Sequence, residues 1–179
     1  HGRLDMEFVS YVLEGELWHK DSMSNAASIR AGEVQRMSAG TGVTHSEYNH
    51  DRERTTHFLQ IWIIPTQPGG TPGYEQRFFA AEEKRGRLRL LVSPDGSEGS
   101  LSVRQDARMS AGLFDGGESA RLALAPGRLG YVHLVRGALE VNGRKLGAGD
   151  ALMCRDEAGI EVVAGVDAEV LVFDLPSLD

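Results

Sequence analysis

The feature of this sequence that most limits its fold is a series of short apolar runs, each closed by glycine, proline, asparagine or aspartate at intervals of about ten residues. The runs are FVSYVLEGELWH, THFLQIWIIP, RLRLLVS, LSVRQDARMSAGLF, ARLALAP, GYVHLVRGALEVNG and AEVLVFDLP. Runs of this length with closely spaced turn residues are typical of strands in an all-β sandwich or barrel. The clearest helical segment is FFAAEEKRG, residues 78–86, where we expect one or two turns. The sequence therefore predicts an all-β fold.

The composition excludes two classes of partner. Hydrophobic residues make up 41% and charged residues 25% of the 179 positions, and no apolar run approaches the ~18–20 residues of a membrane span. The net charge is -7 with acidic and basic residues interleaved, so the basic patch that holds phosphate backbones is missing. We therefore expect no membrane and no direct nucleic-acid partner. The single cysteine, Cys154, is expected to be a buried thiol on a strand. Because one cysteine cannot form an internal disulfide and no signal-peptide pattern is present, we expect the cytoplasm.

A β-unit is repeated in the two halves of the chain. YVLEGEL starts at Tyr11 and HLVRGAL at His133, an offset of 122 residues. AGE at Ala31 and AGD at Ala148 follow at an offset of 117, each ahead of an apolar strand, and the difference fits a longer hairpin loop in the first copy. Both copies have the same order of elements: a strand, a glycine turn, a strand, a loop and an Ala-Gly-acid sequence. Such a repeat indicates one duplicated unit.

The boundary between the copies is predicted near SPDGSEGS, residues 93–100. It divides the chain into an N-terminal domain, 1–95, and a C-terminal domain, 96–179. The chain opens at His1 without methionine and runs at once into MEFVSYVLEG. We therefore expect the N-terminal strands of the first domain to be missing, and His1 to be either native or a tag remnant.

His45 and Glu47 are the pair with the clearest chemistry. They lie two residues apart in SAGTGVTHSEYN, between the first AGE and the next apolar run. In an extended strand, residues i and i+2 face the same side, so the imidazole and the carboxylate converge on one point. His1 and Arg3 have the same spacing, and Glu7 follows four residues later. The pattern predicts a metal site in the first copy.

These positions resemble the two metal-binding motifs of the cupins. The matching residues are Gly32, Ser38-Ala39-Gly40, His45 and Asn49 in one motif, and His1, Arg3 and Glu7 in the other. Within the cupins, the blocks DMEFVSYVLEGELWHKDSMSN, AGEVQRMSAGTGVTHSEYN and LQIWIIP followed by YEQRFF are similar to bacterial pirins over nearly the whole chain. The resemblance implies a bicupin of two jelly-roll-type β-barrels. It also implies one divalent metal ion, commonly Fe(II), with Zn, Ni, Cu or Mn as alternatives.

Arg3 departs from the pattern that the resemblance implies, in which His1, residue 3, His45 and Glu47 hold the metal. A guanidinium has no acceptor and stays protonated, so Arg3 cannot bind a cation. His1, His45 and Glu47 would still form a facial set of two histidines and one carboxylate. Alternatively, Glu7 supplies the missing ligand, or Arg3 pairs with Glu47 and keeps the site free of metal. In a fourth case, the true ligands precede the sequence.

The remaining histidines carry no predicted role. His19, His50 and His57 lie in polar stretches and are expected at the surface, and His133 stands in the second copy without a metal motif around it. We therefore expect the second copy to be metal-free. Tyr48, next to the motif, is a candidate contact for a flat aromatic substrate.

Two functions follow from the resemblance. The first is a dioxygenase similar to quercetin 2,3-dioxygenase, with a small aromatic flavonol and O₂ as substrates and Glu47 as catalytic residue or ligand. The second is a non-enzymatic metal- or redox-sensing regulator that binds partner proteins, and the altered ligand at Arg3 favours it. A third interpretation is an inactive fragment with exposed sheet edges.

Overall fold

The computed structural model describes residues 2–3, 5–40, 42–49 and 53–177, with the backbone alone for residues 2, 3 and 43. The chain forms two compact units. The first contains residues up to Phe79 together with 101–105, and the second contains 80–100 and the residues from Asp106 onward. The chain thus leaves the first unit after Phe79, returns to it for five residues, and leaves it again.

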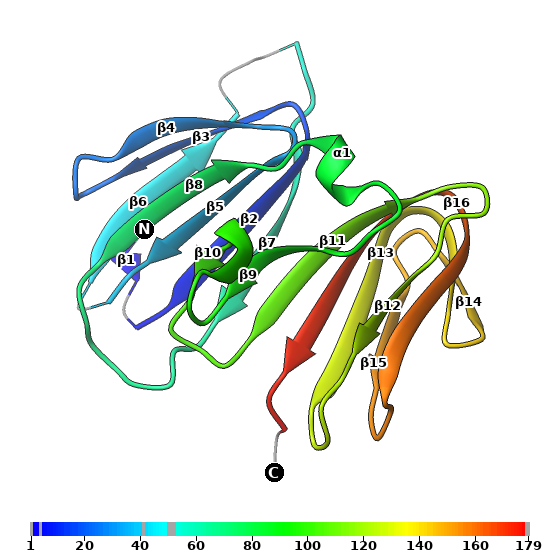
Figure 1. The fold of residues 1–179 in the computed structure, drawn as a ribbon. Coiled ribbons are helices and arrows are strands. Elements are labelled where there is room, and N and C mark those ends of the chain that lie inside the picture. The colour runs from blue at the N-terminus through cyan, green and yellow to red at the C-terminus, as the bar shows by residue number, and fades with distance from the viewer. Residues whose placement is uncertain (1, 4, 41, 50–52, 178–179) are drawn as a thin grey trace. The chain divides into compact units, whose positions relative to one another are not determined.

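The first unit is built from two four-stranded antiparallel sheets (Figure 1). One has the order β1-β6-β3-β4 and the other β7-β2-β5-β8. The strands are β1 (Gly2–Arg3), β2 (Glu7–Glu14), β3 (Glu16–Asp21), β4 (Ala26–Arg30), β5 (Glu33–Ser38), β6 (Val43–Tyr48), β7 (His57–Ile63) and β8 (Gly73–Phe78). The returning segment includes β10 (Leu101–Ser102).

The second unit has one larger antiparallel sheet with the order β9-β11-β16-β13-β14. β12 adds to β16, and β15 adds to β13. The strands are β9 (Arg89–Ser93), β11 (Arg108–Phe114), β12 (Ala120–Ala123), β13 (Leu129–Val141), β14 (Arg144–Gly147), β15 (Ala151–Cys154) and β16 (Gly159–Leu175). The long strands β13 and β16 run side by side along this unit (Figure 1).

Helix is scarce among the described residues. The single-turn helix α1 (Ala81–Lys84) lies within the segment predicted to be helical, and a 3₁₀ turn, η1, covers Ser97–Gly99. No helix in the described part of the chain is long and apolar enough to span a membrane. The all-β prediction is confirmed.

The two copies place their repeated glycines in the same backbone conformation. Gly15 has a φ of 78° and its counterpart Gly137 has 79°, whereas Gly32 has 88° and its counterpart Gly149 has 89°. A Cβ on Gly15 would lie 2.4 Å from the carbonyl oxygen of Thr55, and one on Gly137 would lie 2.3 Å from two carbonyl oxygens of β16. Both positions therefore require glycine for its conformation and for space.

The interiors of the two units differ in polarity. The second unit is filled by a buried apolar cluster: Phe114, Leu124, Val132, Leu134, Leu139, Val141, Leu146, Cys154, Ile160, Val162, Ala168, Val170 and Val172. Cys154 is buried, as predicted. Among the described residues of this unit, the buried charged side chains are Lys84 and Glu169, and neither belongs to the apolar cluster.

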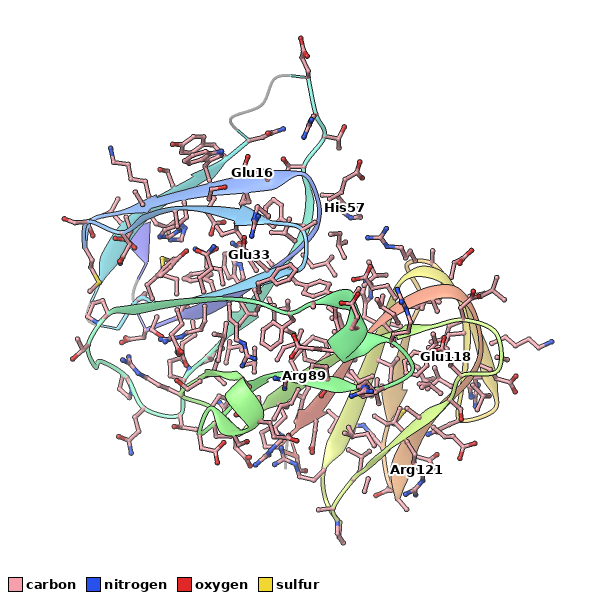
Figure 2. All side chains as sticks on the ribbon, turned by 45° about the horizontal axis from the view of Figure 1, so that its top comes forward. Glu16, Glu33, His57, Arg89, Glu118 and Arg121 are labelled. Carbon is pink, nitrogen blue, oxygen red and sulfur yellow. The ribbon has the colours of Figure 1, made fainter. Side chains whose placement is uncertain are left out.

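The first unit contains both apolar clusters and buried polar side chains. Val12, Leu17 and Ile29 form one apolar cluster, and Phe8 packs in another with Met37 and Ala39. Buried polar side chains share the strand faces that carry these clusters, among them Ser10, His19 and Gln35, and the site described below includes His19. Glu33, at the start of β5, is also buried, and its carboxylate binds Gln76 and Arg30 (Figure 2).

Candidate functional site

His45 and Glu47 lie on β6 and face the same side of the sheet. His45 is 3% exposed, and the Glu47 side chain is 11% exposed. In the antiparallel pairing of β6 with β3, Asp21 lies opposite His45, and His19 lies opposite Glu47. Residues that face each other across an antiparallel pair share one face of the sheet. The strand pair therefore gathers two histidines and two carboxylates in one buried patch.

The two oxygens of the Glu47 carboxylate have different neighbours. Oε2 accepts a 2.7 Å hydrogen bond from the side-chain amide of Gln60 on β7. The amide oxygen of Gln60 accepts a 3.0 Å bond from the indole N–H of Trp62. Oε1 faces the ring of His19, with 3.8 Å to its Nδ1. The Glu47 carboxylate is therefore held through Oε2, and Oε1 is directed at an imidazole.

His19 is buried in the interior, so the prediction that it is a solvated surface residue is wrong. It is 1% exposed, and its Nε2 donates a 2.9 Å hydrogen bond to Oδ2 of Asp21. Burial disfavours a charge on the ring, but the carboxylates of Glu47 and Asp21 outweigh burial and raise the pKa of His19 above its ordinary value. The alternation of β3 puts His19 and Asp21 on the inner face together with Leu17.

Asp21 is fixed by the turn that follows it. Its Oδ1 accepts backbone hydrogen bonds from Met23 at 2.8 Å and from Asn25 at 3.1 Å. Burial works to raise the pKa of Asp21, but hydrogen bonds from His19 and Asn25 lower it, so the carboxylate is ionised at neutral pH. The β3–β4 turn thus sets the direction of the oxygen that binds His19.

His45 has an apolar environment. Its ring lies edge-on to Phe8 with centroids 5.4 Å apart, and Trp62 packs on the same Phe8 ring at 5.4 Å. Its Nδ1 lies 3.1 Å from the sulfur of Met37. Water is therefore largely excluded from this side of the imidazole.

Tyr74 on β8 closes another side of the polar patch. Its ring lies 4.9 Å from that of His19, and its hydroxyl donates a 2.6 Å hydrogen bond to Gln76. Burial, and then the carboxylates of Glu33, Asp21 and Glu47, raise the pKa of Tyr74. Tyr74 therefore stays protonated at neutral pH and acts as a donor.

The predicted ligands are described to different extents. His1 lies outside the described residues. Arg3 pairs through its backbone with Val43 on β6, and its side chain is likewise outside the described part. The Glu7 carboxylate accepts hydrogen bonds from the Ser38 hydroxyl and the backbone N–H of Arg104, so the structure does not bring it to His45.

The other residues considered from the sequence lie away from the patch. Tyr48 follows Glu47 on β6, so it faces the opposite side, and it is 44% exposed. His57 is exposed at the start of β7, as predicted (Figure 2). His50 lies outside the described residues, and His133 is half-buried on β13. Four residues were not assigned to the site from the sequence: His19, Asp21, Gln60 and Trp62. His19 and Asp21 have the same i, i+2 spacing that identified His45 and Glu47, and so do Gln60 and Trp62.

The donor types of the patch fit a divalent metal ion. Imidazole nitrogen with carboxylate oxygen suits first-row transition metals. Among the described residues, no group of three histidine, cysteine, aspartate or glutamate side chains is arranged to hold a metal ion. The described residues alone therefore do not complete a three-residue metal site, and the ligand roles of His45 and Glu47 stay predictions.

The comparisons with known proteins identify the class and the family. A family model described as pirin matches residues 1–63, and one described as the quercetinase C-terminal cupin domain matches residues 90–175. Quercetin 2,3-dioxygenase of Escherichia coli K12 is 43% identical over 176 residues, which are 98% of this chain and 75% of that protein. A pirin-like protein of Caulobacter vibrioides is 38% identical over 175 residues, 97% of this chain and 75% of that protein.

Solved structures agree. The crystal structure of YhhW from Escherichia coli has a TM-score of 0.93 at 44% identity and covers 99% of this chain and 75% of that chain. YhhW in complex with nickel(II) has a TM-score of 0.92 at 43% identity, over 99% of this chain and 76% of that chain. A duplicated β-unit with these neighbours defines a bicupin. The chain belongs to the pirin family, as the sequence predicted.

Proposed function

We propose that this chain is a pirin-type dioxygenase that binds one divalent metal ion through His45 and Glu47, with His1 as the third ligand. The observation that carries the proposal is the placement of His45 and Glu47 on one buried face of β6. The nickel(II) complex of YhhW and the name quercetin 2,3-dioxygenase of the Escherichia coli relative support a metal cofactor and a flavonol substrate with O₂.

The metal, when bound, would supply Lewis acidity that stabilises the enolate of a flavonol. Gln60 donates to Oε2 of Glu47, so Oε1 is the oxygen that would be freer to bind the ion or to accept the proton of a substrate hydroxyl. Phe8 and Trp62 form an apolar wall beside His45 that suits a flat ring. We propose Fe(II) as the ion in the cell, with Zn, Ni, Cu or Mn as alternatives.

A second candidate is a non-enzymatic metal- or redox-sensing regulator that binds partner proteins. Arg3 supports it, because the pirin pattern has a histidine ligand at this position and a binding module tolerates the loss of one ligand better than a catalyst does. In both cases the buried, free thiol of Cys154 suits a reducing compartment, and we propose the cytoplasm.

Oxygen uptake distinguishes the two functions. The chain and an Arg3→His variant are each loaded anaerobically with Fe(II), analysed for metal content, and mixed with quercetin in an oxygen electrode cell. If the native chain binds one iron and consumes oxygen, three ligands suffice and the dioxygenase proposal holds. If only the variant does, Arg3 disables catalysis and the regulatory function is favoured.

Two carboxylate variants test the role of Glu47, one at Glu47 itself and one as a control at Glu33. Glu47→Gln removes the proposed carboxylate ligand and should abolish oxygen uptake. Glu33→Gln makes the same chemical change in the same unit, at a carboxylate bound to Gln76 and Arg30 instead. It should leave oxygen uptake unchanged. Equal loss in both variants contradicts the assignment of Glu47.

A further inference from the structure

A continuous row of polar contacts crosses the interior of the first unit from β3 to β7. Asp21 binds Nε2 of His19 at 2.9 Å, Nδ1 of His19 faces Oε1 of Glu47 at 3.8 Å, and Oε2 of Glu47 binds Gln60 at 2.7 Å. Trp62 completes the row by donating to Gln60 at 3.0 Å. The backbone register sets the central contact, because His19 and Glu47 are directly opposite in the β3–β6 pair.

Of the two ring nitrogens of His19, Nε2 is hydrogen-bonded to Asp21 and Nδ1 is not hydrogen-bonded. Nδ1 is wholly buried and has no hydrogen-bond partner among the residues that the structure describes. Buried polar atoms are paired in the great majority of cases, so an exception needs an explanation. The group that Nδ1 faces is the Glu47 carboxylate, whose Oε1 lies 3.8 Å away, slightly too far for a hydrogen bond.

The direction of Nδ1 is imposed by the β3–β4 turn. Asp21 binds the backbone of Met23 and Asn25 through Oδ1, and this fixes Oδ2, the oxygen that holds Nε2 of His19. The ring cannot turn away from Glu47 without giving up the bond to Asp21. The turn therefore orients Asp21, Asp21 orients His19, and His19 faces Oε1.

We propose that His19, oriented by Asp21, is a positioning residue that fixes Oε1 of Glu47 while Gln60 fixes Oε2. The inference rests on the proposed function, in which Glu47 binds the metal. Partners behind a metal ligand hold it in place before the ion arrives, and their loss costs about 10- to 100-fold in metal affinity. If His19 only filled the interior, it would stabilise the packing through its contact with Tyr74 and would not orient the Glu47 carboxylate.

Nickel(II) affinity of the full chain tests the proposal, measured by competition with a chromogenic chelator. Two variants separate the ring nitrogens: His19→Asn keeps an amide near the place of Nδ1, and His19→Gln keeps one near the place of Nε2. We expect His19→Gln to weaken nickel binding by about 10-fold or more, and His19→Asn to remain within about threefold of the native chain. Thermal unfolding of the metal-free variants reports any general loss of packing.

The outcomes keep the inference and the proposed function apart. Unchanged affinity in Glu47→Gln, with Glu33→Gln as matched control, overturns the proposed ligand itself. If Glu47→Gln weakens binding but both His19 variants bind like the native chain, the positioning role is wrong and Glu47 stands. Equal weakening in both His19 variants, with equally lowered melting temperatures, means that His19 is a packing residue, which also overturns the inference.

Pulsed electron paramagnetic resonance of the Cu(II)-loaded chain provides a second readout, because it counts bound imidazoles. If His19 is a positioning residue, the native chain and His19→Gln should show the same number of copper-bound imidazoles. The loss of one imidazole signal in the variant would make His19 a direct ligand and would overturn the positioning role.

Discussion

The repeated turn glycine of the second unit can be tested with an internal control. Gly137 and Gly127 have φ values of 79° and 80°, so alanine suffers the same backbone strain at both. They differ in space: a Cβ at Gly127 has no atom within 4 Å, whereas one at Gly137 lies 2.3 Å from the carbonyl oxygens of Val166 and Asp167. The pair therefore separates backbone strain from steric overlap.

The expected magnitudes follow from these two terms. A left-handed alanine costs about 1–2 kcal/mol, offset by about 0.4–1 kcal/mol from the smaller freedom of the unfolded chain, so Gly127→Ala should lose roughly 1 kcal/mol. In Gly137→Ala the overlap with main-chain atoms of β16 adds about 1–3 kcal/mol, the usual cost of overpacking. We expect a total loss of roughly 2–4 kcal/mol for Gly137→Ala.

Hydrogen exchange of the native protein measures these losses within the second unit alone. Peptides from β13 and β16 should exchange faster in Gly137→Ala than in Gly127→Ala, with unfolding free energies that differ by about 1–3 kcal/mol. Peptides from β2 and β5 in the first unit provide the reference. Equal losses in the two variants would refute the reasoning, because they would show that the backbone at Gly137 moves aside without cost.

Three further predictions concern single side chains. Burial works to raise the pKa of Glu33, but the hydrogen bond from Gln76 and other contacts lower it, so its stabilisation is present above pH ~4.3 and is lost as pH falls through its folded pKa. Glu33→Gln should therefore cost about 1 kcal/mol in urea unfolding at pH 7 and little at a pH below the folded pKa of Glu33, and a pH-independent cost would contradict this. Burial raises the pKa of Cys154 and shields it, so Ellman's reagent at pH 8 should label the thiol far faster in urea than in buffer, and rapid labelling of the native chain would count against its burial. Leu134→Ala should destabilise the second unit by about 2–5 kcal/mol, because Leu134 is buried in its core. Val166→Ala, at a position 59% exposed, should cost under about 0.5 kcal/mol in the same urea unfolding assay. Similar costs in the two variants would refute the assignment of Leu134 to the core.

The sequence predicted the fold well because local signals specify it. Short apolar runs with glycine turns marked the strands, and the two repeats marked turns that share a φ of 78° and 79°. The placement of His45 and Glu47 on one face of β6 follows from strand alternation alone. Their role as ligands, with His1, stays a prediction.

The rest of the site depends on which strands pair and in which register, and no local pattern contains that information. His19 looks like a polar hairpin residue in WHKDS, and only the β3–β6 register puts it opposite Glu47. Gln60 looks like an ordinary polar position inside an apolar run, yet its amide binds Glu47 from a different sheet. Long-range pairing therefore limited the prediction of the site far more than that of the fold.

The five-residue return of the chain to the first unit has a consequence for how the protein is made. Ser102 binds Glu75, and Arg104 donates its backbone N–H to Glu7 and accepts a bond from the backbone of Thr66. These contacts cannot form on the ribosome until Gln105 has emerged, although the sheets of this unit end at Phe78. At roughly 5–20 residues per second, the nascent unit waits for about one to five seconds with the buried carboxylate of Glu7 incompletely paired.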